Sequence, residues 1–149
     1  QAATPAHLVE QLARGKCLAV SAQHPGAVVI GCDTVVDVNG EVFGKPHSEE
    51  DAKRMLRALS GATHEVHTGV CISDGARTES FVDSCRVTFF PLGKEEIDFY
   101  ASTAEPYDKA GAYAIQGRAA LWLDRIEGDY YTIMGLPVSR TVQLLAHFV

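Results

Sequence analysis

The sequence predicts an α/β fold: a single domain with a mixed, twisted sheet. Stretches with helical periodicity alternate along the chain with stretches rich in valine and isoleucine. Two dipeptides typical of tight hairpins, Asn39–Gly40 and Asp74–Gly75, each join two apolar runs. With 149 residues, 46% of them hydrophobic, the chain is long enough to bury a core. No repeat, linker or low-complexity tract divides it, so we expect one domain over residues 1–149.

Four helices are expected from their caps and apolar stripes. The first has Thr4 as N-cap, followed by proline, and extends to about Ser21. The second has Ser48 as N-cap, carries acidic residues in its first turn and ends at Gly61. Residues 94–102 form a short third helix, and Pro137 begins the last one. The residues expected to face inward are Leu8, Leu12 and Ala19 in the first, Ala52, Met55, Leu56 and Leu59 in the second, and Val138, Val142, Leu145 and Phe148 in the last.

Strands are expected where β-branched residues dominate between turn signals. The expected strands are residues 27–38, 41–44, 64–73, 78–90 and 119–126. Residues 106–117 are expected to be irregular, and residues 127–129 to form a turn.

Charge and composition exclude several classes of function. The net charge is −6, from 19 acidic residues against 13 Lys plus Arg, which argues against a nucleic-acid-binding protein. An anionic substrate would therefore need a local cluster of basic residues, or a metal ion, to offset this field. No apolar stretch approaches the roughly 18 residues of a membrane span, so no membrane partner is expected.

The cysteines and histidines show no metal-binding pattern. The four cysteines form no C-x-x-C pair and no zinc-ligand spacing. Buried, reduced thiols are the favoured interpretation, which predicts a reducing compartment, the cytoplasm. His64 and His67 lie three residues apart in an expected strand, on opposite faces, so they are not expected to share a metal.

The first candidate for chemistry is Asp33, which interrupts an apolar run typical of a sheet interior. A buried carboxylate is costly unless it is paired or binds a metal. The alternative is that the strand has reached the surface and Asp33 is merely solvated. Gly31, two residues earlier, permits close backbone approach and favours a site.

Two lysines are further candidates. Lys45 stands between Gly44 and Pro46, whose stiff backbone would present its ammonium from a fixed loop; the alternative is an ordinary solvated lysine. Lys16 lies at the edge of the first helix's apolar stripe. It either extends to water or points its charge into a groove.

The segment from Asp108 to Gly117 is rich in small residues, which surround Lys109, Tyr113 and Gln116. Such a segment lets a ligand approach the backbone, and the Gln116 amide offers both a donor and an acceptor. The alternative is a tight loop with Tyr113 packed in the core. No Walker or G-x-G-x-x-G phosphate loop is present.

Taken together, six blocks in order resemble the Maf family, also called septum-formation inhibitor or Maf-like nucleotide pyrophosphatases. The blocks are GCDTVV at 31–36, GKP at 44–46, the stretch from Met55 to Gly61, HTGV at 67–70, DKAGAYAIQG at 108–117, and IEGDYY at 126–131 leading to GLP at 135–137. Each block alone is weak, but their order and spacing match over nearly the whole chain.

The resemblance implies an elongated α/β domain with a cleft between two lobes, akin to the inosine triphosphate pyrophosphatases. It also implies house-cleaning hydrolysis of dTTP and UTP, or of modified nucleotides, to monophosphate and pyrophosphate. Matched residue by residue, Asp33 corresponds to the proposed proton acceptor, and Lys16 and Lys45 to lysines of the cleft. Thr34 and Gln116 correspond to positions tied to substrate choice, and Lys109 is expected to bind substrate beside them.

A divalent cation, Mg²⁺ or Mn²⁺, is the expected cofactor, with Asp33 as its protein ligand. Asp33 would hold this ion, orient the attacking water or take its proton, and the sequence leaves these roles open. Lys16 and Lys45 would neutralise charge that grows on the pyrophosphate leaving group.

The chain also departs from the family pattern. The usual N-terminal strand with its Ser-x-Arg-Arg loop has no match, and Cys32 stands where alanine is usual. A non-catalytic nucleotide-binding or regulatory module, a 7-methyl-GTP pyrophosphatase and a purine-directed enzyme are therefore the alternatives. Residues 115–117 and 128–131 look more like the pyrimidine branch. The sequence leaves open whether the protein forms a homodimer.

Overall fold

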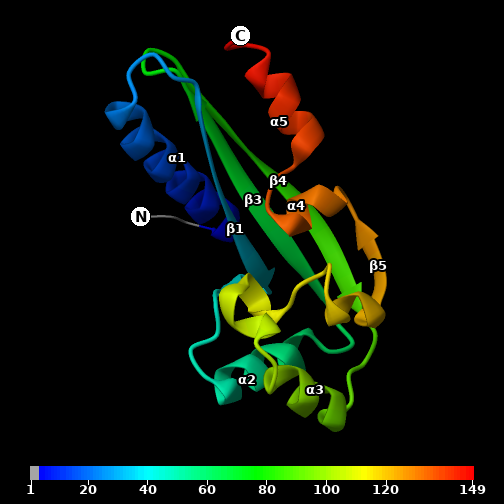
Figure 1. Ribbon diagram of the computed structural model, residues 1–149. Coiled ribbons are helices and arrows are strands. Elements are labelled where there is room, and N and C mark those ends of the chain that lie inside the picture. The colour runs from blue at the N-terminus through cyan, green and yellow to red at the C-terminus, as the bar shows by residue number, and fades with distance from the viewer. Residues whose placement is uncertain (1–3) are drawn as a thin grey trace. The chain divides into compact units, whose positions relative to one another are not determined.

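The computed structural model describes residues 4–149, which form five strands packed with helices (Figure 1). The helices are α1 (Pro5–Gln23), α2 (Glu49–Leu59), α3 (Lys94–Ala101), α4 (Tyr130–Met134) and α5 (Val138–Leu145). The strands are β1 (Val29–Val38), β2 (Glu41–Phe43), β3 (Thr63–Ser73), β4 (Thr78–Phe89) and β5 (Leu123–Glu127), in the sheet order β2-β1-β3-β4-β5. The expected α/β class is confirmed. No helix in this described part is both long and apolar enough to cross a membrane.

The hairpin between β1 and β2 is the one expected from the sequence. Asn39 and Gly40 both have positive φ, of 52° and 90°, as the tight turn that matches strand twist requires. The two strands pair antiparallel, with Val36 opposite Phe43. The outer pair β4 and β5 is also antiparallel.

The chain forms two compact units. Unit 1 comprises the described residues up to Thr34, together with His67–Ser84 and Asp129–Val149. Unit 2 comprises Val35–Val66 and Cys85–Gly128.

In unit 1, helix α1 lies almost in backbone contact with the sheet. A Cβ on Gly31 would stand 2.8 Å from the Cys17 Cβ, and a Cβ on Gly69 would stand 2.6 Å from the Val9 carbonyl oxygen. At this separation only small residues fit on the inner face of the helix. The buried residues are Val9, Ala13, Cys17 and Ser21.

The prediction that Leu8, Leu12 and Ala19 form the inner face of this helix is therefore wrong. Leu12 is 42% exposed, Ala19 is exposed and Leu8 is only partly covered. The N-cap prediction is confirmed, because the Thr4 hydroxyl accepts a hydrogen bond of 3.0 Å from the His7 amide.

The C-terminal part of unit 1 also differs from expectation. Helix α4 occupies residues that no helix was predicted for, and Asp129 is its N-cap, accepting from the Tyr131 amide at 2.8 Å. Pro137 precedes α5 as predicted, but Val138 and Val142 are exposed instead of facing inward, and Leu145 and Phe148 are only partly covered. The buried residue of α5 is Thr141, whose hydroxyl donates to the Pro137 carbonyl.

In unit 2, the core is apolar and aromatic. The prediction for α2 is confirmed: Ser48 caps the helix, and Ala52, Met55, Leu56 and Leu59 are all buried. Phe89 and Tyr100 each stack edge-on against Trp122, with ring centroids 6.0 and 4.7 Å apart. Phe89 also meets Tyr113, at 5.0 Å.

The predicted strand over residues 119–126 is only partly correct. Residues Arg118–Trp122 form a 3₁₀ helix that buries Ala119 and Trp122, and the strand begins at Leu123. The preceding residues 105–112 contain two further short 3₁₀ turns, as an irregular segment should.

Candidate functional site

Asp33 and Lys16 come together in unit 1. Asp33 lies on β1, on the same face as Gly31, and this face is covered by α1. Lys16 extends from α1, and its ammonium lies 3.1 Å from the Asp33 Oδ1 atom. The lysine side chain is 58% exposed and the aspartate side chain 24%, so the pair lies at the surface of the unit. Such an exposed ion pair stabilises the fold little, and both groups stay accessible to a ligand.

The Asp33 carboxylate has one oxygen that Lys16 does not engage. Its Oδ2 atom has no hydrogen-bond partner among the described residues of its own unit. One carboxylate oxygen, completed by water and phosphate oxygens, is the protein contribution that Mg²⁺ commonly accepts. The donor set therefore fits a divalent cation. Beside it, burial raises the pKa of the Cys32 thiol, which Lys16 opposes and Asp33 reinforces, so this thiol is neutral near pH 7.

Thr34 points to the other face of β1. Its hydroxyl lies 2.8 Å from the hydroxyl of Thr68 on β3. A Cβ on Gly135 would stand 3.7 Å from the Thr34 Oγ1 atom, so the glycine leaves the space beside that hydroxyl open. Asp33 and Thr34 are neighbours in sequence, but the alternation of the strand presents them to opposite sides.

A chain of hydrogen bonds continues from Thr34 through unit 1. Thr68 is fully buried and donates to the Thr132 carbonyl oxygen of α4 at 2.8 Å. The Thr132 hydroxyl donates to Asp83 Oδ2 at 2.5 Å. Arg140 of α5 closes the chain with an ion pair of 2.6 Å to the other oxygen of Asp83.

Lys45 lies in unit 2, in an exposed position after β2. Its loop is held by the Gly44 carbonyl oxygen, which accepts a hydrogen bond of 3.1 Å from the Gly111 amide. Gly111 has a φ of 75°, and a Cβ there would overlap Val36, so the contact requires glycine. The sequence block that contains Lys45 and the block that contains Lys109 thus meet within this unit.

Lys109 is next to Asp108, with an ion pair of 2.7 Å between their side chains. The hydrogen bond from Lys109 is the main cause that lowers the pKa of Asp108, and the charge of Lys45 lowers it further. Both lysines therefore contribute positive charge to the same part of unit 2, as a site for an anion requires.

Gln116 is exposed on a loop whose backbone is held by hydrogen bonds to Glu105 and Tyr100. Glu105 accepts from the Tyr100 hydroxyl at 2.5 Å and from the Arg118 amide at 3.2 Å. The Tyr100 hydroxyl also accepts from the Ala114 amide at 3.1 Å, and burial raises its pKa, so it stays protonated. These bonds satisfy the loop backbone on both sides of Gln116, whose side chain is left accessible at the surface.

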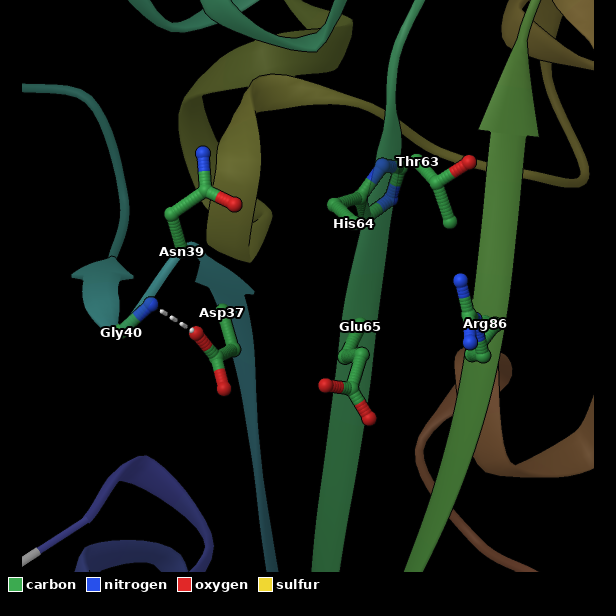
Figure 2. A pocket seen from close by; sticks show the side chains of 7 residues that line it. All are labelled: Asp37, Asn39, Gly40, Thr63, His64, Glu65 and Arg86. Carbon is green, nitrogen blue, oxygen red and sulfur yellow. Dashed lines mark hydrogen bonds between the residues drawn. The ribbon is translucent and has the colours of Figure 1, made fainter.

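A shallow pocket of about 240 Å³ also lies in unit 2, and none of the candidate catalytic or substrate-binding residues lines it. Figure 2 shows side chains of Asp37, Glu65 and Arg86 extending from three neighbouring strands, and the Gly40 amide donating to Asp37 at 2.8 Å. Carboxylate oxygens of Asp37 and Glu65 lie within 4.8 Å of each other. Arg86 supplies a cation to the same pocket, so its walls carry both signs of charge.

Sequence reasoning missed the supporting residues of both units. Asp83 gave no such signal as Asp33, because polar residues such as Ser80 and Ser84 stand near it in its strand. Thr68 belongs to a block that was recognised, but nothing in its residue type indicated a role. Glu105 and Tyr100 carry no local signal, because their partners lie up to 14 residues away.

The chain is similar to known proteins over nearly its whole length. The family model described as "Maf-like protein" matches residues 1–148. The dTTP/UTP pyrophosphatase of Bacillus velezensis is 50% identical over 145 residues, which are 97% of this chain and 77% of that protein. The dTTP/UTP pyrophosphatase of Symbiobacterium thermophilum is 51% identical over 145 residues, covering 97% and 75%. That of Bacillus mycoides is 46% identical over 145 residues, covering 97% and 76%.

Proposed function

Because the chain belongs to the family of Maf-like proteins, we propose that it is a nucleoside triphosphate pyrophosphatase acting on dTTP and UTP. Water would add to the α phosphorus, the bond to the bridging oxygen would break, and the products would be the monophosphate, pyrophosphate and a proton. Relatives at about half sequence identity, named dTTP/UTP pyrophosphatase, support the reaction class and the substrate. The accessible pair of Asp33 and Lys16 is the structural observation that carries the proposal.

Asp33 is the group that we assign to the attacking water. Its Oδ1 atom is engaged by Lys16, and Oδ2 is left to accept a hydrogen bond or a proton from water. Lys16 keeps the carboxylate oriented and places a positive charge next to the reacting phosphates. Negative charge grows on the departing pyrophosphate, and fixed cations stabilise it.

A divalent cation fits the donor set of Asp33, which would hold it through one carboxylate oxygen. When bound, such an ion neutralises the triphosphate and polarises the phosphorus–oxygen bond that breaks. The four cysteines are reduced thiols, which agrees with action in the reducing cytoplasm, a part of the proposal.

Unit 2 carries three further candidate residues for nucleotide binding. Lys45 and Lys109 provide cations for phosphate oxygens. The exposed amide of Gln116 can donate to a pyrimidine carbonyl and accept from the ring N3–H group, and a purine edge would leave one of these groups unpaired. We therefore assign Gln116 to base selection.

The test is a release assay with Mg²⁺ or Mn²⁺ and a panel of dTTP, UTP, GTP and 7-methyl-GTP, scored for monophosphate and pyrophosphate. Asp33→Asn should lower kcat/KM by at least about 10²-fold, because the variant loses a base or a metal ligand. Asp124→Asn, the same substitution at an exposed position of β5, is the matched control and should leave the rate nearly unchanged.

Three results would contradict the proposal. Nucleotide binding without any pyrophosphate release would favour a non-catalytic module. A preference for 7-methyl-GTP would remove the pyrimidine assignment. Turnover near wild type in a folded Asp33→Asn variant would remove Asp33 from the reaction.

A further inference from the structure

The turn that carries Gln116 is short and closed. The Gly117 amide donates to the Ala114 carbonyl oxygen at 3.0 Å, which leaves Ile115 and Gln116 as the central residues of the turn. Ile115 is 5% exposed and belongs to the core of unit 2, whereas Gln116 is exposed. One central residue thus anchors the turn, and the other presents its amide at the surface.

Glu105 holds the backbone on both sides of this turn. The Ala114 amide can only donate, so the Tyr100 hydroxyl accepts from it at 3.1 Å and gives its own proton to Glu105 Oε2 at 2.5 Å. The Arg118 amide donates to the same Oε2 atom at 3.2 Å. A single carboxylate oxygen therefore ties together the residue before the turn and the residue after it.

Both side chains of this brace, Tyr100 and Glu105, are themselves fixed by their surroundings. Tyr100 is 1% exposed, and its ring stacks edge-on against Trp122 in the aromatic core. Burial raises the pKa of Tyr100, so its proton stays available to the carboxylate. A Cβ on Gly117 would stand 2.2 Å from Glu105 Oε1, so the carboxylate occupies the space that a side chain would need. The brace therefore leaves the turn little freedom.

We propose that Glu105 is a positioning residue, which fixes the Gln116 amide through one acceptor oxygen while its negative charge takes no part in turnover. This inference rests on the proposed role of Gln116 in base selection. The competing roles for a glutamate in this part of unit 2 are metal ligand and general base. The geometry favours positioning, because both hydrogen bonds end on Oε2 and both donors belong to the protein.

The first test compares Glu105→Gln with Glu105→Ala. A glutamine oxygen can accept from both Tyr100 and Arg118, so Glu105→Gln should keep kcat/KM for dTTP within about threefold of the wild type. Loss of a metal ligand or general base would lower it by at least about 10²-fold, which would overturn the inference. Glu105→Ala frees the turn and should raise KM by about 10-fold with kcat nearly unchanged, as expected when ground state and transition state lose the same contact.

A double-mutant cycle tests whether Glu105 acts through Gln116. Glu105→Ala and Gln116→Ala should each lower the ratio of kcat/KM for dTTP over GTP, and the double variant should lower it no further than Gln116→Ala alone. Additive effects would overturn the inference. Glu95→Ala, at an exposed position of α3, is the matched control and should leave KM and the ratio unchanged. Tyr100→Phe keeps the aromatic ring and breaks the bond to Ala114, so it replaces Glu105→Ala in the cycle if that variant does not fold.

Amide hydrogen exchange tests the brace without any nucleotide. The amide protons of Ala114 and Arg118 should exchange at least about 10-fold faster in Glu105→Ala, and near the wild-type rate in Glu105→Gln. Unchanged exchange in Glu105→Ala would contradict the inference whether or not the protein hydrolyses nucleotides. Absence of hydrolysis in the wild type would contradict the proposed function, and dissociation constants for dTTP and GTP would then replace kcat/KM in the cycle.

Discussion

Each of the two compact units is stabilised internally by a different kind of interaction. In unit 1, a chain of directional hydrogen bonds passes from Thr34 through two buried threonines to the Asp83–Arg140 ion pair. In unit 2, edge-on aromatic contacts join His64, Phe89, Tyr113, Trp122 and Tyr100. Aromatic packing stabilises through buried area and tolerates small displacements, whereas hydrogen bonds fix atoms and proton positions. The difference teaches that unit 1 is built for geometry and unit 2 for stability.

The largest effect should come from the aromatic core of unit 2. Trp122→Ala removes a side chain that is 2% exposed and that contacts Phe89 and Tyr100, so the free energy of unfolding should fall by about 3–5 kcal/mol. Leu121→Ala is the control. The Leu121 side chain, next to Trp122 in the sequence, is 72% exposed, so its loss should change little. Urea denaturation of both variants tests the contrast, and equal losses would show that burial of Trp122 is not the cause.

A pH effect of similar size should arise from His64. Burial lowers the pKa of His64 to about 4, from 6.5 in the unfolded chain. The unfolded chain therefore binds a proton that the folded protein does not, and stability should fall as the pH decreases from about 6.5 to about 4. The full loss is about 3 kcal/mol.

His64→Gln should flatten this dependence, and His24→Gln, at an exposed position, should leave it unchanged. Denaturation midpoints measured at several pH values between 4 and 7 provide the comparison. A wild-type stability that stays level over this range would show that His64 is protonated inside the folded protein.

The smallest effect on stability should come from the polar chain of unit 1. Thr132→Val removes the hydrogen bond to Asp83, which leaves a partly buried carboxylate with Arg140 as its remaining partner in the chain. The expected loss is about 1–3 kcal/mol. Thr63→Val, which removes an exposed hydroxyl, is the control. If the Thr132 variant lost no more stability than the control, this series of hydrogen bonds would not stabilise unit 1.

The sequence predicted correctly those elements whose conformation is set by residues close together in the chain. Helix α2 was predicted with its cap and all four inward residues, because a serine cap, three acidic residues and an apolar stripe agree there. The hairpin at Asn39–Gly40 was predicted because few other residues adopt positive φ at both positions.

Where tertiary contacts decide, the sequence was misleading. Helix α1 presents its small residues to the sheet instead of its leucines, because Gly31 and Gly69 allow a closer approach than hydrophobicity alone indicates. Helix α4 was missed because its residues favour strands or turns. It is held by Asp129 at its N-terminus and by the contacts of Thr132.

For the site, residue type and resemblance predicted the charged groups, and the structure adds their partners. The ion pair of Lys16 with Asp33 needed the placement of α1 over β1, which no sequence pattern indicated. The opposite orientation of Thr34 follows from strand alternation and could have been stated from the sequence. The roles of Asp33, Lys45, Lys109 and Gln116 in binding or turnover stay predictions.

The glycines beneath α1 have a consequence for how this region can evolve. Each stands where an added methyl group would collide with the helix, so the spacing of helix and sheet is set by the absence of two side chains. The same spacing determines whether the Lys16 ammonium reaches Asp33. Most of the atoms that such a methyl group would meet belong to the helix backbone, so a smaller side chain on the helix could not make room, and both positions should stay glycine across related sequences. Pressure to keep one charge in place would thus be recorded at positions that carry no charge.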